Sequence, residues 1–293
     1  MAAREMKKLN RMDKIILFAH MMKTAGSTLA NMLVEHYGRG AHFPLRGEEM
    51  KAKPYNPERL LNDYAKTNGK LKLVGGHSIR PYIDYGDLEK DLTWFTFFRK
   101  AENRYISHFL FIKFQTNNFS KKRYQSMKSK TIDEWERIEN YSNYQTKFIA
   151  GEENLQKAID IVETKMKWVG LTEDLPNGFF SLKEHLAIDG LYIDTQKRNS
   201  SEASKEEREM LIKDFGDYIT EQNQIDIQLY DYVKKNVYPR YREYDKAKTD
   251  ADGKAGLVRF VNKIDYQLFR KMTFDETKWD IKNLKKYYKR FYK

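Results

Sequence analysis

The chain has 293 residues, 40% of them hydrophobic, and a formal net charge of +12. The apolar content is enough to bury a core and excludes a wholly disordered chain, while the absence of cysteine excludes disulfides and cysteine-bound metals. The basic surplus indicates anionic partners such as nucleotides, nucleic acid or acidic glycans, and the alternative interpretation is a lysine-rich solvated surface.

The first apolar run, residues 14–19, predicts a buried β-strand. Lys7 and Lys8 precede it as in a signal peptide, but the run is too short for most such segments. No apolar stretch approaches the roughly 20 residues that a transmembrane helix needs. Because the absence of cysteine also suits a reducing compartment, we expect a cytoplasmic protein without a membrane span.

Strands and helices alternate along the next part of the chain. A turn of small residues at 24–28 leads into a helical pattern through Leu29, Met32 and Leu33, and strand–turn–helix is the opening unit of a nucleotide-binding α/β domain. Residues 41–57 hold three of the six prolines and are predicted to form a loop. Further strands are predicted at 71–74, 93–98 and 166–170, and helices over 58–66, most of 101–165, 176–185 and 205–236. We therefore predict an α/β fold of P-loop type, in which helices flank both faces of a mainly parallel central sheet.

The composition changes near residue 246. We predict one domain over residues 1–245 and a basic, aromatic-rich helical extension over 246–293, which carries 14 Lys/Arg against 6 Asp/Glu. The aromatic residues near its end alternate with lysine and arginine and are suited either to stacking on bases or sugars or to packing on the chain's own domain. We favour packing for this cluster, which consists of Tyr287, Tyr288, Phe291 and Tyr292.

The strongest chemical motif follows the first strand and reads His20-Met-Met-Lys23-Thr24-Ala25-Gly26-Ser27-Thr28. A turn of small residues lets backbone N–H groups close around a phosphate, and the next helix presents its positive N-terminus there. Lys23 adds a mobile charge, while Ser27 and Thr28 add hydroxyl donors. The motif is not a Walker A sequence, because its lysine precedes the glycine. The alternative is an ordinary turn in which Thr24 or Ser27 caps the helix.

A second motif closes the strand at 93–98. Arg99 is expected at the carboxyl end of that strand, where open α/β sheets bind ligands. Ser107 lies eight residues on, in the next helix, where its hydroxyl is placed to meet the same anion as the Arg99 guanidinium. For Arg104 we expect an exposed helix charge.

The histidines have different expected roles. His77 follows the strand at 71–74 and the glycine pair before it, and histidine at a pocket is the usual general base. His20 ends the first strand, and we expect a structural role for it. The remaining histidines lack metal-ligand spacing, so we expect no metal site; they are His36, His42, His108 and His185.

Together the motifs resemble a sulfotransferase family that uses the donor PAPS (3′-phosphoadenosine 5′-phosphosulfate). It includes the heparan sulfate 2-O- and 6-O-sulfotransferases and their bacterial relatives. The family carries a loop like H-I-P-K-T-G-G-T-S for the 5′-phosphosulfate, onto which residues 23–28 fall: Lys23, Thr24, Ala25, Gly26, Ser27 and Thr28. It also carries a block like R-D-P-x-x-R-Y-x-S for the 3′-phosphate, onto which Arg99 and Ser107 fall. Met22 replaces the loop proline, and Lys100-Ala101 replaces Asp-Pro.

Weaker likenesses follow in the family's order and extend the resemblance over roughly residues 13–240. They lie at 143–151, 169–175, 197–200 and 223–230. The third of these adds Lys197 and Arg198 to the expected nucleotide-binding residues.

The resemblance implies an enzyme that transfers a sulfuryl group in line from PAPS to an acceptor hydroxyl, releasing PAP (adenosine 3′,5′-bisphosphate). His77, which matches a catalytic histidine of several glycan-modifying relatives, is expected to deprotonate the acceptor. Lys23 is expected to neutralise the leaving phosphate, and Arg99 with Ser107 to select PAPS over ATP. A glycan or small-molecule acceptor is expected, with no metal and no nucleic-acid partner. Two alternatives stay open: a P-loop kinase or NTPase, and a non-catalytic basic module that binds nucleic acid or polysaccharide.

Overall fold

The computed structural model describes residues 14–44, 53–114, 129–194, 205–245 and 256–274. Within these residues the centre of the fold is a sheet of five parallel strands in the order β2-β3-β1-β4-β5. In that order the strands span Ala41–His42, Leu73–Gly76, Ile15–Ala19, Leu92–Phe98 and Met166–Leu171. The predicted α/β fold with a parallel central sheet is confirmed.

Strand β1 lies in the middle of the sheet and is buried along its whole length. Ile15 and Leu17 face one hydrophobic core, whereas Ile16 and Phe18 face a second core on the opposite side of the sheet. Because helices cover both faces, the strand reads as a continuous apolar run and not as an alternating pattern.

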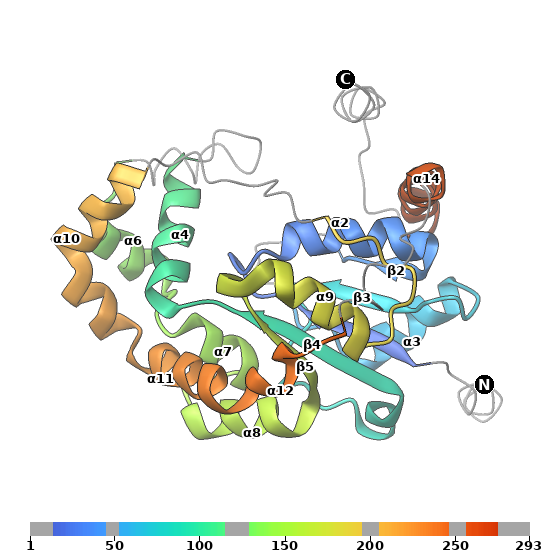
Figure 1. The fold of residues 1–293 in the computed structure, drawn as a ribbon, viewed down its shortest axis with the longest axis horizontal. Helices are drawn as coiled ribbons and strands as arrows, with labels where there is room; N and C mark the ends of the chain where they lie inside the picture. Colours follow the sequence, from blue (N-terminus) through green and yellow to red (C-terminus); the bar gives the residue numbers. More distant parts are fainter. Residues whose placement is uncertain (1–13, 45–52, 115–128, 195–204, 246–255, 275–293) are drawn as a thin grey trace.

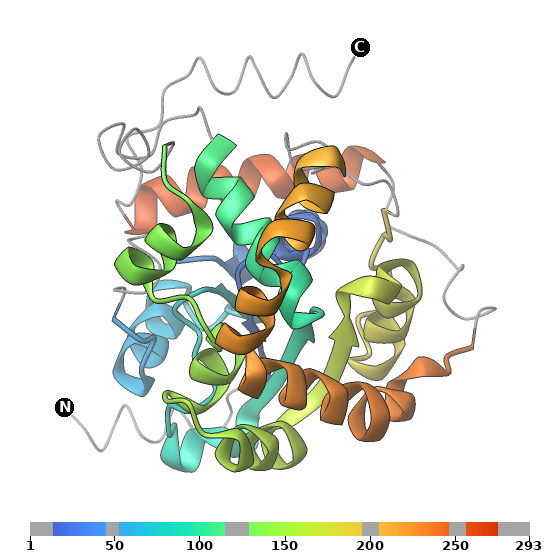
Figure 2. The same ribbon diagram turned by 90° about the vertical axis from the view of Figure 1, so that its left-hand side faces the viewer.

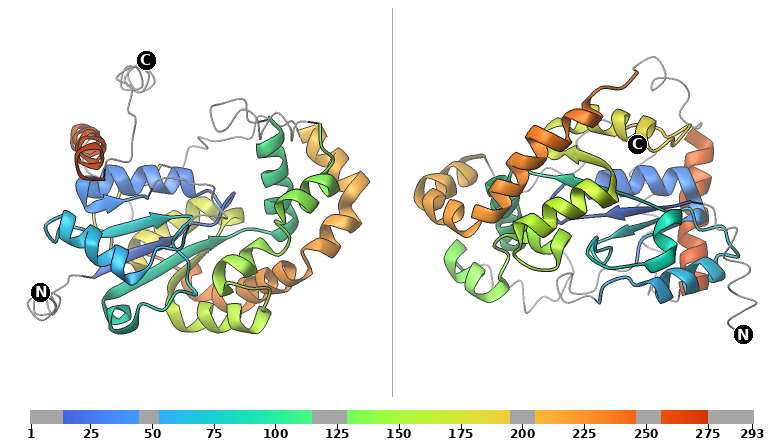
Figure 3. Two further views of the ribbon diagram at one scale, coloured as in Figure 1. Left: turned by 180° about the vertical axis from the view of Figure 1, so that it is seen from behind. Right: turned by 90° about the horizontal axis from the view of Figure 1, so that it is seen from below.

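Helices cover the two faces of the sheet (Figures 1 and 3). One face carries α2 (Gly26–Tyr37), α9 (Leu175–His185) and α14 (Gly256–Phe274). The other carries α3 (Pro57–Lys66), α7 (Tyr144–Ala150), α8 (Leu155–Lys165) and α11 (Gln224–Tyr232). A π-helical turn, Val233–Val237, and α12 (Pro239–Arg242) follow α11.

Three further helices stand beyond the carboxyl ends of the strands, at the left of Figure 1 and in front in Figure 2. They are α4 (Ala101–Phe114), α6 (Ile132–Glu139) and α10 (Lys205–Gln222). A buried carboxylate joins α6 to α4, because Glu136 of α6 accepts hydrogen bonds from the Tyr105 hydroxyl of α4 and from the Tyr141 amide. Helix α10 packs on α4. This group of helices therefore forms one side of the region above the strand ends.

The predicted elements differ from the structure in two places. The segment 41–57, expected to be a loop, contains the two-residue strand β2 and a buried Tyr55 whose hydroxyl bonds Asp63 at 2.7 Å. The helical pattern at 205–236 is not one helix, since α10 ends at Gln222 and α11 begins at Gln224.

Helix α14 belongs to the predicted C-terminal extension and packs on α2. The Asn262 side-chain amide donates to the carbonyl oxygens of Glu35 and His36, each at 3.0 Å, at the C-terminal end of α2. Asp265 pairs with Arg39 just beyond that end. This part of the extension is therefore packed on the domain, while the expected Tyr287–Tyr292 cluster lies outside the described residues.

Candidate functional site

Two sequence-predicted site residues, His77 and Arg99, lie with His20 where strands β1, β3 and β4 end. His20 follows β1, His77 follows β3 and Arg99 follows β4. Because neighbouring strands are parallel, their carboxyl ends meet at one edge of the sheet, and open α/β sheets bind ligands at that edge.

The loop between β1 and α2 leaves the first turn of α2 uncapped by side chains. Ala25 is the N-cap residue, lies in the left-handed region at φ 63° and makes no side-chain capping bond. The Thr24 hydroxyl instead donates to the Met21 carbonyl at 2.8 Å. Neither Thr24 nor Ser27 is therefore the N-cap that the alternative interpretation of this turn expected. The N–H groups and positive dipole of the first turn suit an anionic ligand.

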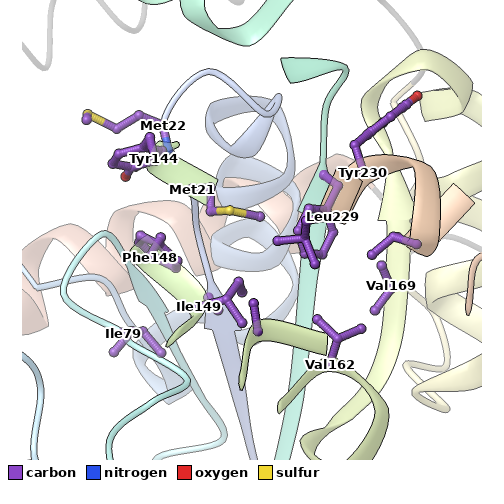
Figure 4. Close-up of a cluster of buried hydrophobic side chains, with 14 of the residues drawn as sticks. Met21, Met22, Ile79, Tyr144, Phe148, Ile149, Val162, Val169, Leu229 and Tyr230 are labelled. Carbon is purple, nitrogen blue, oxygen red and sulfur yellow. The ribbon is translucent and has the colours of Figure 1, made fainter. Parts of the chain in front are cut away.

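Two methionines, Met21 and Met22, pack beneath this loop. Met21 and Met22 are buried against α7 and α11, in the cluster shown in Figure 4. The Met22 amide donates to the Tyr144 hydroxyl at 3.4 Å, a bond that a proline at this position would lack because it has no N–H. The Met22 amide thus joins the loop to the Tyr144 side chain of α7.

Two histidine rings and a glycine meet at the base of the loop. The His20 ring lies so close to Gly26 that a Cβ added at Gly26 would be 1.8 Å from His20 Nε2. The His20 and His77 ring centroids are 4.3 Å apart. The strand-end positions of His20 and His77 were predicted from the sequence, but this ring contact was not, because it depends on the pairing of β1 with β3.

The hydrogen bond of His77 assigns its tautomer. Nδ1 lies 2.7 Å from the His20 carbonyl oxygen, which can only accept a proton. We therefore place the proton of the neutral ring on Nδ1, which leaves Nε2 as the acceptor nitrogen. A histidine in this tautomer is suited to take a proton from a ligand at Nε2.

Arg99 is held at both its backbone and its side chain. Gln145 accepts from the Arg99 amide at 3.0 Å and donates to the Arg99 carbonyl at 2.9 Å. The Arg99 guanidinium donates from Nη1 to the Lys23 carbonyl at 3.0 Å. The end of β4 is thereby joined to the loop after β1.

The guanidinium of Arg99 lies among other cations. Burial, together with repulsion from Arg208 of α10 and Arg104 of α4, lowers the pKa of Arg99 to about 10, and only Glu173 among the named charges raises it. An anion beside Arg99 would relieve both the burial cost and the repulsion. This balance of charges favours an anion-binding role for Arg99.

Arg104 differs from its prediction, because its side chain is fully buried. Its Nη2 donates to the Tyr141 carbonyl at 3.1 Å, and its guanidinium carbon lies 4.7 Å from the centre of the Tyr144 ring. The expected exposed helix charge is therefore wrong. Arg104 faces the segment between α6 and α7, a contact that the local pattern of α4 does not reveal.

The face of α4 that turns towards the loop carries Ser107 and Phe111. The two residues are four apart and so lie one helical turn from each other. Ser107 is buried, whereas Phe111 is 36% exposed, and the ammonium of Lys23 lies 4.2 Å from the centre of the Phe111 ring. Sequence analysis missed Phe111, because nothing in its local pattern distinguishes it from a core residue.

The segments 143–151 and 223–230, which carry two of the weaker likenesses, contact each other and fix the residue that holds Arg99. Asp226 of α11 accepts from the amides of Gln145 and Thr146 at 2.9 and 2.7 Å. Asn143 in turn accepts from the amides of Ile225 and Asp226 at 3.0 and 3.2 Å. Each helix start is thus capped by the other segment, and the pair fixes Gln145, which holds Arg99.

The segment 169–175, which carries a third likeness, contributes Glu173 next to Arg99. Its carboxylate accepts from the Lys100 amide at 2.9 Å and from the Tyr230 hydroxyl at 3.1 Å. Lys100 replaces the family's aspartate, yet this contact involves only its backbone. The remaining expected ligands, Lys197 and Arg198, lie outside the described residues.

No protein-family model matches the chain, and no curated protein matches it either. Among the described residues, no group of three or more His, Asp or Glu side chains is placed to hold a metal ion. The helices of the described segments include none that is long and apolar enough to cross a membrane.

Proposed function

We propose that the chain is a PAPS-dependent sulfotransferase, which moves a sulfuryl group from PAPS to a hydroxyl of an acceptor, with a carbohydrate as the favoured class. The observation that carries the proposal is the bond from Arg99 to the Lys23 carbonyl. It fixes a largely buried guanidinium against an uncapped helix N-terminus. Two anion-binding groups held side by side suit a nucleotide that has phosphates at both its 5′ and 3′ positions.

The donor is bound by groups from two elements. The amides of residues 24–28 and the N-terminus of α2 hold the 5′-phosphate, aided by the hydroxyls of Ser27 and Thr28. Arg99 and Ser107 hold the 3′-phosphate. Lys197 and Arg198 add charge to the same nucleotide in this proposal. ADP and ATP lack the 3′-phosphate, so the second set of groups provides the selection for PAPS.

Transfer requires one proton acceptor and one positive charge. His77 Nε2 takes the proton of the acceptor hydroxyl while the acceptor oxygen forms a bond to sulfur. The bond from sulfur to the bridging oxygen of the 5′-phosphate breaks, and PAP leaves with the bonding electron pair. The Lys23 ammonium neutralises the charge that develops on that oxygen. The tautomer assigned to His77 supports its part in this sequence.

A kinase or NTPase of Walker A type is less well supported. In that motif the lysine follows the last glycine of the loop, at the start of the helix. In this chain Lys23 precedes Gly26, and it lies in the left-handed region at φ 67° before the helix begins. In this proposal the Lys23 side chain therefore reaches a bound phosphate from the strand side of the loop and not from the start of the helix.

The direct test is a transfer assay with ³⁵S-labelled PAPS against classes of acceptor: glycans, lipid-linked sugars, small alcohols and tyrosyl peptides. We expect one class to acquire label. Lys23→Ala should lower that rate on the order of 10²-fold or more while thermal unfolding is little changed. Lys147→Ala, which removes a lysine at another helix, is the matched control. Absence of labelled product with every class, or a folded Lys23→Ala variant of near-native rate, would contradict the proposal.

A further inference from the structure

Lys23 and Phe111 form a contact that the proposed reaction does not itself require. The ammonium lies 4.2 Å from the ring centre, within the range of a cation–π attraction. Phe111 is 36% exposed, while its neighbours Phe109 and Leu110 are 2% exposed. The ring thus contributes little to the core and presents a face beside the lysine.

The position of Phe111 places it at the transferring end of the donor. Ser107, proposed to meet the 3′-phosphate, lies one helical turn or about 6 Å nearer the start of α4. Lys23 is proposed to act at the bridging oxygen next to sulfur. A ring that contacts the Lys23 ammonium therefore lies near the sulfuryl group, where the acceptor must approach.

The cation–π contact is weaker than the bonds that a phosphosulfate offers. At an exposed site such a contact changes an equilibrium constant about two- to five-fold. Charge-assisted hydrogen bonds from an ammonium to phosphate oxygens are stronger, and they need a nitrogen–oxygen distance near 2.8 Å. The four-carbon stem of Lys23 allows the ammonium to move between the two partners.

We propose that Phe111 is a positioning and specificity residue. Its ring holds Lys23 until the donor draws the ammonium away, and the uncovered ring face then receives the sugar or apolar face of the acceptor. The donor accordingly binds before the acceptor. This inference rests on the proposed sulfotransferase function and adds to it the chemistry of the acceptor side and an order of binding.

The first test is a set of calorimetric titrations with PAP. Phe111→Leu keeps an apolar side chain but removes the ring, so Lys23 no longer gives up the ring contact when PAP binds. We expect PAP to bind about two- to five-fold more tightly to this variant than to the unaltered protein. Phe114→Leu, on the same helix, should leave PAP affinity unchanged. In a Lys23→Ala background the effect of Phe111→Leu should vanish, which a merely structural role of the ring would not produce.

The second test follows the lysine directly. In protein labelled with ¹³C-lysine, the ε-CH₂ protons of Lys23 should be displaced upfield by the ring, and PAP should remove that displacement. Phe111→Leu should lack it from the start. With the acceptor identified by the labelled-PAPS assay, Phe111→Leu should raise the acceptor KM at least five-fold and leave the KM for PAPS no higher.

The outcomes separate the two proposals. If the unaltered protein does not bind PAP, the sulfotransferase function fails. If the protein binds PAP but Phe111→Leu binds PAP equally or more weakly, the role of Phe111 is overturned and the function stands. The same holds if Phe111→Leu tightens PAP binding as much in the Lys23→Ala background as in the unaltered protein. An unchanged acceptor KM would overturn the acceptor-side role in the same way.

Discussion

Arg99 reaches the loop after β1 through its side chain, by a 3.0 Å bond from Nη1 to the carbonyl oxygen of Lys23. The same residue is fixed at its backbone by two hydrogen bonds with the buried Gln145. A displacement of the loop would therefore also displace the residue that follows β4, and a displacement of that residue would displace the loop. The two proposed phosphate subsites consequently keep a fixed separation.

The proposed base can be separated from nucleotide binding. Replacing His77 by Gln keeps a polar side chain near the His20 carbonyl but removes the proton-accepting Nε2. We expect kcat to fall by about 10²- to 10⁴-fold, the contribution typical of a positioned base, with PAP affinity almost unchanged. Survival of activity together with loss of PAP binding would assign His77 to the nucleotide site instead.

Gly26 is predicted to be intolerant of any side chain. A Cβ there would lie 1.8 Å from His20 Nε2, so the His20 ring must move and disturb its contact with His77. Gly26→Ala should lower both activity and Tm. Gly216→Ala is the matched control, because a Cβ at Gly216 meets nothing within 4 Å, and alanine should stabilise α10 by up to about 1 kcal/mol. The double variant His20→Ala with Gly26→Ala should recover Tm relative to Gly26→Ala alone. Failure of that recovery would show that the clash is not the cause.

Helix α14 should stabilise the domain without taking part in nucleotide binding. Asn262→Ala removes the donor to two carbonyls at the end of α2 and should reduce the free energy of unfolding by about 1–3 kcal/mol. PAP affinity should stay the same, because this end of α2 is far from the phosphate loop: the 12-residue helix is about 18 Å long. Thermal unfolding and PAP titration of the same preparation check both statements. A normal Tm with a raised acceptor KM would mean that α14 serves the acceptor.

The sheet was predictable because buried parallel strands appear in the sequence as apolar runs flanked by glycine or charged residues. Strand β2 was not, since two residues within a proline-containing segment carry no periodic signal, and β2 exists only by pairing with β3. The sequence predicted one helix over 205–236, whereas the structure has a break at Asn223. The buried Asn223 side chain donates to the Ile219 carbonyl at this break.

The candidate site was predictable only where one segment carries the chemistry. The loop at 23–28 and the position of Arg99 follow from local order along the chain. The burial of Arg104, the close approach of the His20 ring to Gly26 and the contact of Lys23 with Phe111 each depend on the packing of segments in three dimensions or on helical geometry. No local pattern encodes these contacts, so they emerged only in three dimensions.

Selection for the 3′-phosphate is the central claim, and paired titrations with PAP and ADP test it most directly. If Arg99 and Ser107 contact that group, PAP should bind about a hundredfold more tightly than ADP, which corresponds to two to three kcal/mol. EDTA should leave the PAP affinity unchanged. Arg99→Ala should reduce the difference between the PAP and ADP affinities, mainly by weakening the binding of PAP. Equal affinities for PAP and ADP, or binding that occurs only with magnesium, would contradict the account and indicate a kinase or NTPase.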